Sequence, residues 1–413
     1  MPGLNTVRAL AALGVVMLHA GVPYLRNPMP GLQWSVQDSA STLVDCLFWA
    51  IEVFIMPVFL LLAGFFVWQT LQRKGQAVLL KGRAKRLLIP LLFGMLVVLP
   101  IDLYIWVAGW ISDGLVSPVK LKSLKFDGAI GENIWGLSHL WFLLYLFLYV
   151  VVTATIATAN NRSQRFAKIW SRVCSLPTSV LACTLVFGGA CVLMVSPEVV
   201  WGFQHAFAPV PSKWLYSGSF FAGGILLSVC DPQLDLIKRS STRLIPVAIL
   251  FLAAAVVLGR WHLDGLSRPE SVDRPSQASF ARTTLALMTT SSAWLITLSL
   301  IGLSLKFVQR NCLAMQYLAA ASFWVYLVHH PLLGLIHIDL KWLAPNLAPA
   351  IKMGLAFAIS VGVSLLLYEA FIRTSALGRA LGFAWEGPRK TPISSFDQPA
   401  VVQPETDGRR RAA

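Results

Sequence analysis

Long runs of apolar residues recur along nearly the whole chain, and they constrain its fold more than any other feature. An α-helix needs about 20 consecutive apolar residues to cross the hydrocarbon core of a bilayer. Ten such runs are present, at 5–25, 42–70, 87–110, 134–158, 178–197, 213–230, 243–260, 282–305, 314–337 and 347–371. We therefore predict an all-α fold, a polytopic bundle of about ten transmembrane helices over residues 1–373. The tail 374–413 is expected to be cytoplasmic and disordered, because its later part is rich in Pro, Ser and Arg.

Charged residues are scarce and unevenly distributed between these runs. They make up 13% of the 413 residues, about half the share found in a soluble domain. Counted on alternate sides of the membrane, 23 Lys and Arg residues fall on the side of the N-terminus and 11 on the other. Because cytoplasmic loops carry the excess of Lys and Arg, both termini are predicted to be cytoplasmic. The net charge of +15 then reports topology, and we exclude a nucleic-acid partner.

Three further features narrow the function classes. None of the six cysteines has the spacing of metal ligands, so no metal ion is expected. No internal repeat is apparent, which disfavours a transporter built from inverted repeats. Residues 261–281 have the composition of a mobile outer loop that faces a substrate.

Ionisable residues inside a membrane span are costly and therefore mark candidate functional sites. In the first span Arg8 lies near the cytoplasmic end and His19 toward the outer half. They are eleven residues apart in the sequence, so we expect them on one helix face, about 16 Å apart along the axis. Such a pair suits the two ends of an elongated ligand. The structural alternatives are a topology-setting charge that snorkels for Arg8 and a buried neutral imidazole for His19.

Two more arginines precede the third span on the cytoplasmic side. Arg83 and Arg86 are expected at a helix start, with Pro90 a turn later. Guanidinium groups match phosphate oxygens in charge and geometry, so these residues could hold phosphates. A role in topology and lipid head-group binding explains them equally well. Glu369, at the inner end of the last span, could pair with either arginine.

Polar residues also occur at the outer ends of other spans. His139 and Trp141 open the fourth span at the outer surface. Glu52, near the outer end of the second span, is either a pathway carboxylate or an interfacial one, and the same holds for Asp102 in the third span.

The ninth span contains the densest polar group, Tyr326, His329 and His330, well inside the outer half of the membrane. Pro331 interrupts the helix there and can free a backbone carbonyl as a hydrogen-bond partner. Structural pairing of the two histidines is the alternative to a catalytic role. Taken together, the histidines gather toward the outer half and the arginines at the inner face.

With these residues in place, the chain resembles acyltransferase family 3, the membrane-bound O-acyltransferases of bacterial surface and periplasmic glycans. The resemblance runs over most of residues 1–373. An R-x10-H motif falls on Arg8 and His19, and R-x-x-R followed by Pro falls on Arg83, Arg86 and Pro90. The segments 138–144 (SHLWFLL), 326–332 (YLVHHPL) and 367–369 (LYE) most resemble members associated with succinylation of osmoregulated periplasmic glucans.

The resemblance implies an enzyme of the bacterial inner (cytoplasmic) membrane, an acyltransferase for groups other than amino-acyl groups. Its donor would be a cytoplasmic acyl-CoA, with succinyl-CoA favoured over acetyl-CoA, and its acceptor a hydroxyl of a periplasmic glucan. No permanently bound cofactor is implied. Arg8, Arg83 and Arg86 would bind the anionic donor at the inner face. Asn5 departs from the Asp that is common in the family, which puts a proton-partner role at that position in doubt.

For the chemistry, His19 would act as general base on the acceptor hydroxyl, because an imidazole can take up and return a proton near neutral pH. A covalent acyl-His19 intermediate is the alternative route. A second set of residues would orient His19 or stabilise the oxyanion, namely His329, His330 and Tyr326. A third set would line the acceptor entry, namely His139, Trp141 and Glu52.

Two other functions stay open. An O-acetyltransferase acting on lipopolysaccharide or exopolysaccharide keeps the chemistry and changes the substrate. A non-catalytic glycan transporter or flippase keeps the membrane fold without the chemistry. Acyl groups that appear on an external glycan when the donor is inside a vesicle would separate an enzyme from a flippase.

Overall fold

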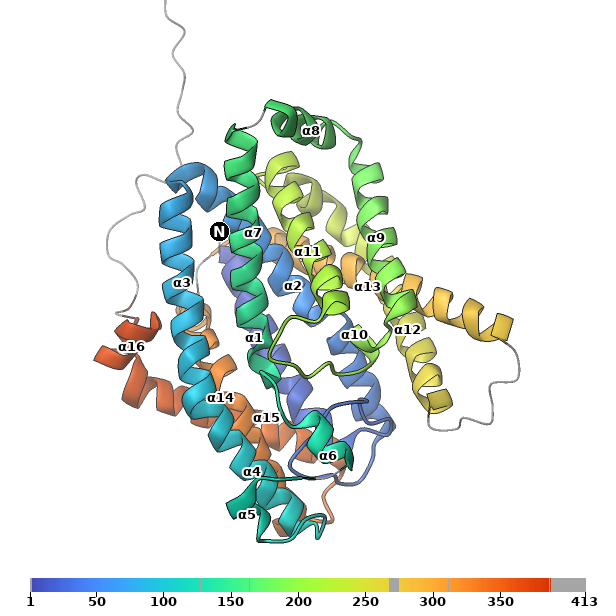
Figure 1. Cartoon of the computed structure of the whole chain (residues 1–413), viewed down its shortest axis with the longest axis vertical. Helices are drawn as coiled ribbons and strands as arrows, with labels where there is room; N and C mark the ends of the chain where they lie inside the picture. Colours follow the sequence, from blue (N-terminus) through green and yellow to red (C-terminus); the bar gives the residue numbers. More distant parts are fainter. Residues whose placement is uncertain are drawn as a thin grey trace, which may run out of the picture.

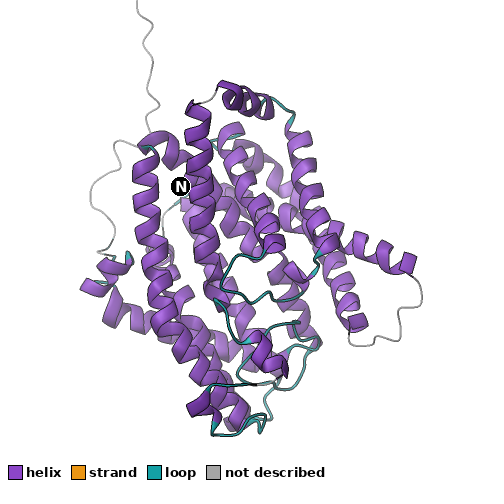
Figure 2. Cartoon of the chain, viewed as in Figure 1, coloured by secondary structure: helices purple, strands orange, loops and turns teal. Residues whose placement is uncertain are grey.

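The computed structural model is a bundle of α-helices (Figure 1). It describes residues 2–126, 128–162, 164–266, 275–310, 312–385 and 387, and no strand occurs among them (Figure 2). Within these ranges, nine helical stretches are long and apolar enough to cross a membrane: Pro2–Tyr24, Thr42–Lys74, Gln76–Ser112, Ser138–Ala159, Thr178–Val195, Asp235–Leu266, Ser279–Phe307, Leu313–Leu343 and Pro349–Ile372. The predicted all-α membrane bundle is confirmed, while the cytoplasmic location of both termini stays a prediction.

The long helices are α1 (Pro2–Gly21), α2 (Thr42–Lys74), α3 (Gln76–Phe93), α4 (Leu99–Ser112), α7 (Trp141–Arg162), α9 (Thr178–Val195), α11 (Pro211–Cys230), α12 (Asp235–Leu266), α13 (Pro275–Phe307), α14 (Leu313–Leu343) and α15 (Pro349–Leu367). Shorter elements connect them: η1 (Val22–Tyr24), α5 (Lys120–Ser123), α6 (Gly128–Asn133), η3 (Ser138–Leu140), α8 (Gln164–Cys174), α10 (Glu198–Trp201) and α16 (Ala376–Leu381). Two π-helical turns, η2 (Gly94–Val98) and η5 (Tyr368–Ile372), continue α3 and α15.

Of the ten predicted spans, the one at 213–230 has no counterpart among these nine stretches. It forms α11, a helix of 20 residues. It packs closely on α2. A Cβ atom on Gly64 would lie 2.0 Å from the backbone oxygen of Phe221, and one on Gly224 would lie 2.0 Å from that of Leu61. The two glycines therefore allow direct backbone contact, as small residues do between membrane helices. This crossing places the side chains of α11 opposite those of α2.

Helix α1 contacts α2, α13, α14 and α15, so that most of its length is enclosed by other helices (Figure 1). Its buried residues include Ala9, Ala11, Ala12 and Ala20, and such small side chains let neighbouring helices approach closely. Helix α1 runs from one end of the bundle toward the other and is one of the elements that link the two ends (Figure 1).

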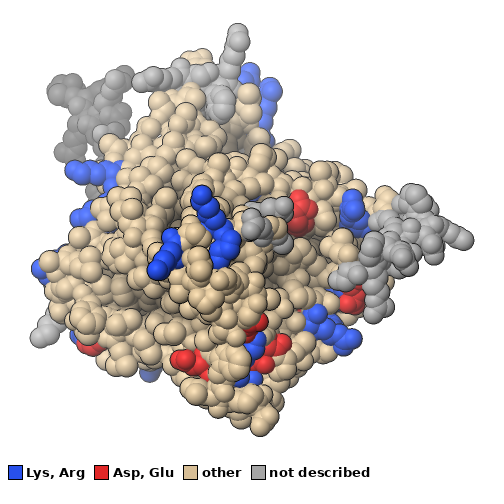
Figure 3. Space-filling model, turned by 60° about the horizontal axis from the view of Figure 1, so that its bottom comes forward, with Lys and Arg blue, Asp and Glu red and all other residues tan. Residues whose placement is uncertain are grey.

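The two ends of the bundle differ in character. The N-terminus, the α2–α3 turn and α8 lie at the end drawn uppermost in Figure 1, which the charge count predicts to face the cytoplasm. The opposite end carries α4, α5, α6 and many of the loops (Figure 2). Figure 3 views this opposite end, where Lys and Arg residues are scattered among uncharged surface together with Asp and Glu.

The segment 261–281 differs from its prediction as a mobile loop. Helix α12 continues to Leu266 and α13 begins at Pro275, so the described part of this segment is helical. Residues 267–274 lie outside the described residues. The described residues of the segment therefore belong to helix ends that extend past the apolar spans.

The start of the predicted disordered tail, 374–413, is folded against the bundle. The side chain of Ser375 caps α16 by accepting the N–H of Gly378 at 2.9 Å, a typical helix N-cap. Leu381 and Phe383 are buried, and the hydroxyl of Tyr368 donates to the backbone oxygen of Phe383 at 2.9 Å. The folded unit thus extends past residue 373 to at least residue 385, and residues 388–413 lie outside the description.

Candidate active site

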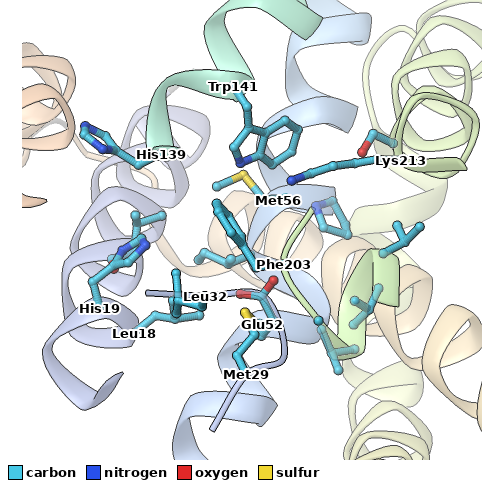
Figure 4. Close-up of a pocket in the computed structure, with 18 of the residues that line it drawn as sticks. Leu18, His19, Met29, Leu32, Glu52, Met56, His139, Trp141, Phe203 and Lys213 are labelled. Atoms are coloured by element: carbon cyan, nitrogen blue, oxygen red, sulfur yellow. The ribbon is translucent and has the colours of Figure 1, made fainter. Parts of the chain in front are cut away.

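A pocket lies between α1, α2, α7, α11 and α14, with the loops that follow α1 and α10 closing part of its wall. The empty space of the pocket, together with the part that opens to solvent, is about 970 Å³. Of the residues predicted from the sequence, His19, Glu52, His139, Trp141, Tyr326 and His330 all line it. Figure 4 shows His19 and His139 on one side of this pocket and Lys213 on the other. Five separate elements therefore bring one set of polar side chains together.

His19 is held in one orientation by two neighbours. Its Nδ1 atom lies 2.9 Å from the backbone oxygen of Val15 and 3.2 Å from Nε2 of His329. In turn, Nδ1 of His329 lies 2.7 Å from the backbone oxygen of Tyr326. A carbonyl oxygen only accepts, so both Nδ1 atoms must carry the proton, and a neutral imidazole then has an unprotonated Nε2. His329, which does not line the pocket, thereby fixes the tautomer that leaves Nε2 of His19 as a base.

His139 is positioned by a local break in α14. Pro331 has no N–H, so the carbonyl of Leu327, four residues earlier, is not taken up by the helix. Nε2 of His139 lies 3.2 Å from that oxygen and donates to it. The predicted free carbonyl therefore exists, and its partner is His139. Ser138, just before, adopts the left-handed region at φ 48° while its N–H donates to Nε2 of His205 at 3.0 Å.

His330 forms a buried pair with a carboxylate of the third span. Nδ1 of His330 donates to Oδ2 of Asp102 at 2.7 Å. Asp102 lies in the first turn of α4, directly after the π-helical turn η2. The bond leaves Nε2 of His330 as the unprotonated nitrogen of a residue that lines the pocket. Asp102 is buried at 3% exposure and contacts a residue of the site.

The elements α4, η3 and α14 together supply the atoms of a potential metal site. Asp102, His139 and His330 each offer a ligand atom, and these atoms lie within 4.8 Å of one another. Oδ1 of Asp102 and Nδ1 of His139 are buried without a hydrogen-bond partner among the described residues. The expectation of no metal stays a prediction. The Asp102–His330 hydrogen bond is the alternative use of these groups, because it occupies one carboxylate oxygen and one ring nitrogen.

Tyr326 has a different role from the one expected. Its hydroxyl donates to the backbone oxygen of His139. A phenol has one proton to donate, so in this arrangement it is not available to an oxyanion. Tyr326 instead joins α14 to the turn that carries His139.

An aromatic wall beside the histidines was not anticipated from the sequence. The ring of Trp34, from the loop after α1, lies 4.6 Å from that of His330 and 6.1 Å from that of His19, centroid to centroid. Nε1 of Trp34 donates to Nδ1 of His337 at 2.9 Å, and His337 bonds the backbone oxygen of Ala20 at 3.2 Å. A tryptophan in a polar connecting segment gives no periodic signal that could have revealed it.

The loop that carries Trp34 is anchored by a buried ion pair. Nζ of Lys352, a fully buried side chain of α15, donates to Oδ2 of Asp38 at 2.7 Å. Burial acts to raise the pKa of Asp38, but the hydrogen bonds from Lys352 and from the backbone N–H of Ser39, together with the charge of Lys352, outweigh it and hold this pKa below the ordinary value. From the sequence, Lys352 is expected only as one of the charges on the outer side of the membrane.

Glu52 and Trp141 share their part of the pocket with Lys213 of α11 (Figure 4). Nζ of Lys213 lies 3.9 Å from the centre of the Trp141 ring and 5.1 Å from that of Phe203, a cation–π arrangement. Glu52 and Lys213 attract each other electrostatically, but they form no ion pair within 4.0 Å. Lys213 lies near the start of an apolar helix, where a lysine ordinarily indicates a snorkelling charge, so no role for it is expected from the sequence.

The three predicted donor-binding arginines form a separate group at the other end of α1. Arg8, Arg83 and Arg86 are close enough to repel one another electrostatically. Arg8 and Arg86 are exposed and Arg83 is half-buried, and none of them lines the pocket. Within the described part of the chain, no carboxylate pairs with them. Glu369, the expected partner, pairs with Arg373 instead. Arg83 and Arg86 lie inside α3, two turns past its start, and not at a helix start as expected.

This arrangement provides distinct chemical capabilities at its two ends. The guanidinium groups, which have no carboxylate partner among the described residues, favour a polyanion such as a phosphate group. The pocket offers an oriented imidazole base and a carboxylate-paired imidazole, which together can move a proton to or from a bound hydroxyl. One helix connects the two.

The chain resembles known acyltransferases along most of its length. The model of the family described as an acyltransferase domain, acyltransferase 3, matches residues 1–369. Relatives include Glucans biosynthesis protein C of Escherichia coli strain K12, of Escherichia coli strain SMS-3-5 and of Shigella dysenteriae serotype 1. Each is 24% identical over 393 residues, which cover 91% of this chain and 92% of the relative. None of the solved structures matches the chain.

Proposed function

The chain belongs to acyltransferase family 3, and from that premise we propose that it moves a succinyl group from cytoplasmic acyl-CoA to hydroxyls of a periplasmic glucan. It is an acyltransferase and a multi-pass membrane protein. The glucan acceptor is supported by the likeness to Glucans biosynthesis protein C, whose name concerns glucan synthesis. A periplasmic acceptor and a cytoplasmic donor place the enzyme in the inner membrane.

The observation that carries this proposal is the state of His19. His19 lines the pocket, and its Nδ1–H is directed at Val15 and His329, so Nε2 is the atom that can accept a proton. A general base needs this combination of an accessible nitrogen, a fixed tautomer and an orienting partner. A purely structural histidine would have no need to keep one nitrogen open to a pocket.

The transfer step follows from that geometry. Nε2 of His19 takes the proton of the acceptor hydroxyl as its oxygen attacks the thioester carbon. The carbon–sulfur bond breaks as the tetrahedral oxyanion collapses, and the proton passes from His19 to the departing thiolate. His330, whose tautomer is fixed by Asp102, is placed to assist the proton transfers from the neighbouring side of the pocket.

The donor is held at the opposite end of α1. Arg8, Arg83 and Arg86 would bind the phosphates of the acyl-CoA, and the donor arm would run along α1 toward His19. This distance suits an elongated donor, because the eleven residues that separate Arg8 from His19 span about 16 Å of helix.

A direct test is mass spectrometry of periplasmic glucans from cells with the gene, without it, and with the gene for His19→Ala. The proposal expects succinyl groups on the glucans only when the wild-type protein is present. Equal succinylation without the gene would reject the glucan as acceptor. Full succinylation with His19→Ala, at equal protein in the membrane, would reject the role of His19.

A further inference from the structure

Lys213 is a buried cation whose ammonium is not paired with a carboxylate. The residue is 6% exposed, yet its side chain lines the pocket opposite His19 (Figure 4). No hydrogen bond or ion pair joins its Nζ to any described residue, and its close neighbours are the faces of Trp141 and Phe203. A buried ammonium is costly unless an anion or several acceptors satisfy it. The two aromatic faces only partly meet that need.

Glu52 is the only carboxylate among the described residues that line this pocket, and it does not complete the pair. The other titratable groups around the pocket are His19, His139, Tyr216, Tyr326 and His330. None of these is an acid that would be charged near neutral pH. An ammonium has three N–H donors, so Lys213 can attract Glu52 across the pocket and still bind a second anion directly.

The proposed reaction offers few candidates for that anion. The phosphates of the donor would be held by Arg8, Arg83 and Arg86, which do not line the pocket. The sugar hydroxyls of a glucan are neutral. An acyl group derived from a dicarboxylic acid is different, because it carries a free carboxylate at the end away from the thioester. With the thioester at His19, the opposite side of the pocket, where Lys213 lies, is the part left for that carboxylate (Figure 4).

We propose that Lys213 binds the free carboxylate of the acyl group and thereby selects a dicarboxylic donor such as succinyl over acetyl. This inference rests on the proposed acyl transfer and adds the residue that decides its donor. Trp141 and Phe203 shield the ammonium from water, which strengthens its attraction for a carboxylate. Glu52 balances the charge of Lys213 when no acyl group is bound.

The test measures kcat/KM of the reconstituted full-length enzyme with succinyl-CoA, acetyl-CoA and the methyl ester of succinyl-CoA, whose acyl group ends in a neutral ester. For the wild type, the ester should react about 100-fold more slowly than succinyl-CoA, because removing one partner of a buried charge pair weakens binding by roughly this factor or more. This arm needs no variant and so cannot fail through misfolding. Similar rates with the ester and succinyl-CoA would overturn the proposal.

The matched variants are Lys213→Met, Lys213→Arg and, as a control, Lys341→Met, whose lysine pairs with Asp113 outside the pocket. Lys213→Met should lose the preference for succinyl-CoA while keeping acetyl transfer, and Lys213→Arg should keep the preference. Lys341→Met should behave as the wild type. Equal loss with both donors in Lys213→Met would show that the lysine acts on the acceptor or the fold. Transfer of neither acyl group by the wild type would overturn the proposed acyl transfer itself, whereas equal rates with the ester and succinyl-CoA would overturn only the role of Lys213.

Discussion

The backbone oxygen of Leu327 accepts the Nε2–H of His139 at 3.2 Å, and it can do so because Pro331 leaves that carbonyl outside the hydrogen-bond ladder of α14. A helix defect in one span thus positions a side chain from another. The defect costs stability in α14, and its effect is to bring His139 against His330, with ring centroids 4.7 Å apart.

Pro331→Ala should therefore lower activity without lowering stability. An alanine N–H at this position would take back the Leu327 carbonyl, and His139 would lose its partner. We expect acyl transfer to fall about tenfold or more, as small displacements of reacting groups do, while the thermal unfolding temperature stays equal or rises. Pro246→Ala, in the interior of α12, is the matched control and should leave the rate unchanged. Unchanged activity in Pro331→Ala would argue against this positioning.

Asp102→Asn should impair catalysis and spare donor binding. The substitution keeps the shape of the side chain but replaces one carboxyl oxygen by an amide nitrogen, which cannot accept the Nδ1–H of His330. We expect kcat to drop about 100-fold, within the range of proton-transfer contributions, with little change in the KM for the donor. Asp113→Asn is the control, because Asp113 pairs with Lys341 away from the pocket. A rise in donor KM at constant kcat would instead assign Asp102 to binding.

Arg83→Ala and Arg86→Ala should weaken donor binding with little effect on kcat. These guanidinium groups are remote from the pocket and have no carboxylate partner among the described residues. A uniform binding contribution raises KM and leaves kcat unchanged, and the effect should shrink at high ionic strength. Lys81→Ala, an exposed cation on the same helix, is the control. If the lysine variant raises the KM as much, a general surface charge explains the result.

Asp38→Asn should loosen the loop that carries Trp34. Lys352 is fully buried and Asp38 is partly buried, so the substitution should cost less than the roughly 3–5 kcal/mol that removing one partner of a fully buried ion pair costs. Because the pKa of Asp38 is below its ordinary value, the pair stabilises the fold above the pKa of an unfolded Asp, about 3.9. That contribution disappears as the pH falls through the lowered pKa of the folded state. Unfolding temperatures of the wild type and variant should therefore differ at pH 7 and converge in acid; a constant difference would refute this linkage.

The separation of histidines and arginines could be predicted from the sequence because ionisable residues are rare in apolar spans and each one stands out. His19, His139 and His330 do share a pocket, and the arginines do lie at the other end of α1. The partnership of Asp102 with His330 could not be predicted, because it depends on how α4 and α14 are rotated against each other. The sequence offers no period that fixes such a rotation, least of all after a π-helical turn.

Lys213 and Trp34 were missed for a different reason. Each belongs to a residue type that commonly occurs at membrane interfaces, so its local sequence fits an anchoring role. Only the close contact of α11 with α2, made by Gly64 and Gly224, places Lys213 in the pocket. The boundaries at 261–281 and 374–385 were misjudged because polar helix ends and a short capped helix have the composition of loops.

The proposals above depend on one statement: His19 accepts a proton while the protein transfers an acyl group from an inner donor to an outer acceptor. It is tested most directly in sealed vesicles that hold labelled succinyl-CoA inside and glucan outside. We expect labelled glucan outside with the wild type and with His262→Ala, because His262 does not line the pocket. With His19→Ala we expect a rate at least about 100-fold lower. Undiminished labelling with His19→Ala, or label that appears only when donor and glucan share one side, would contradict it.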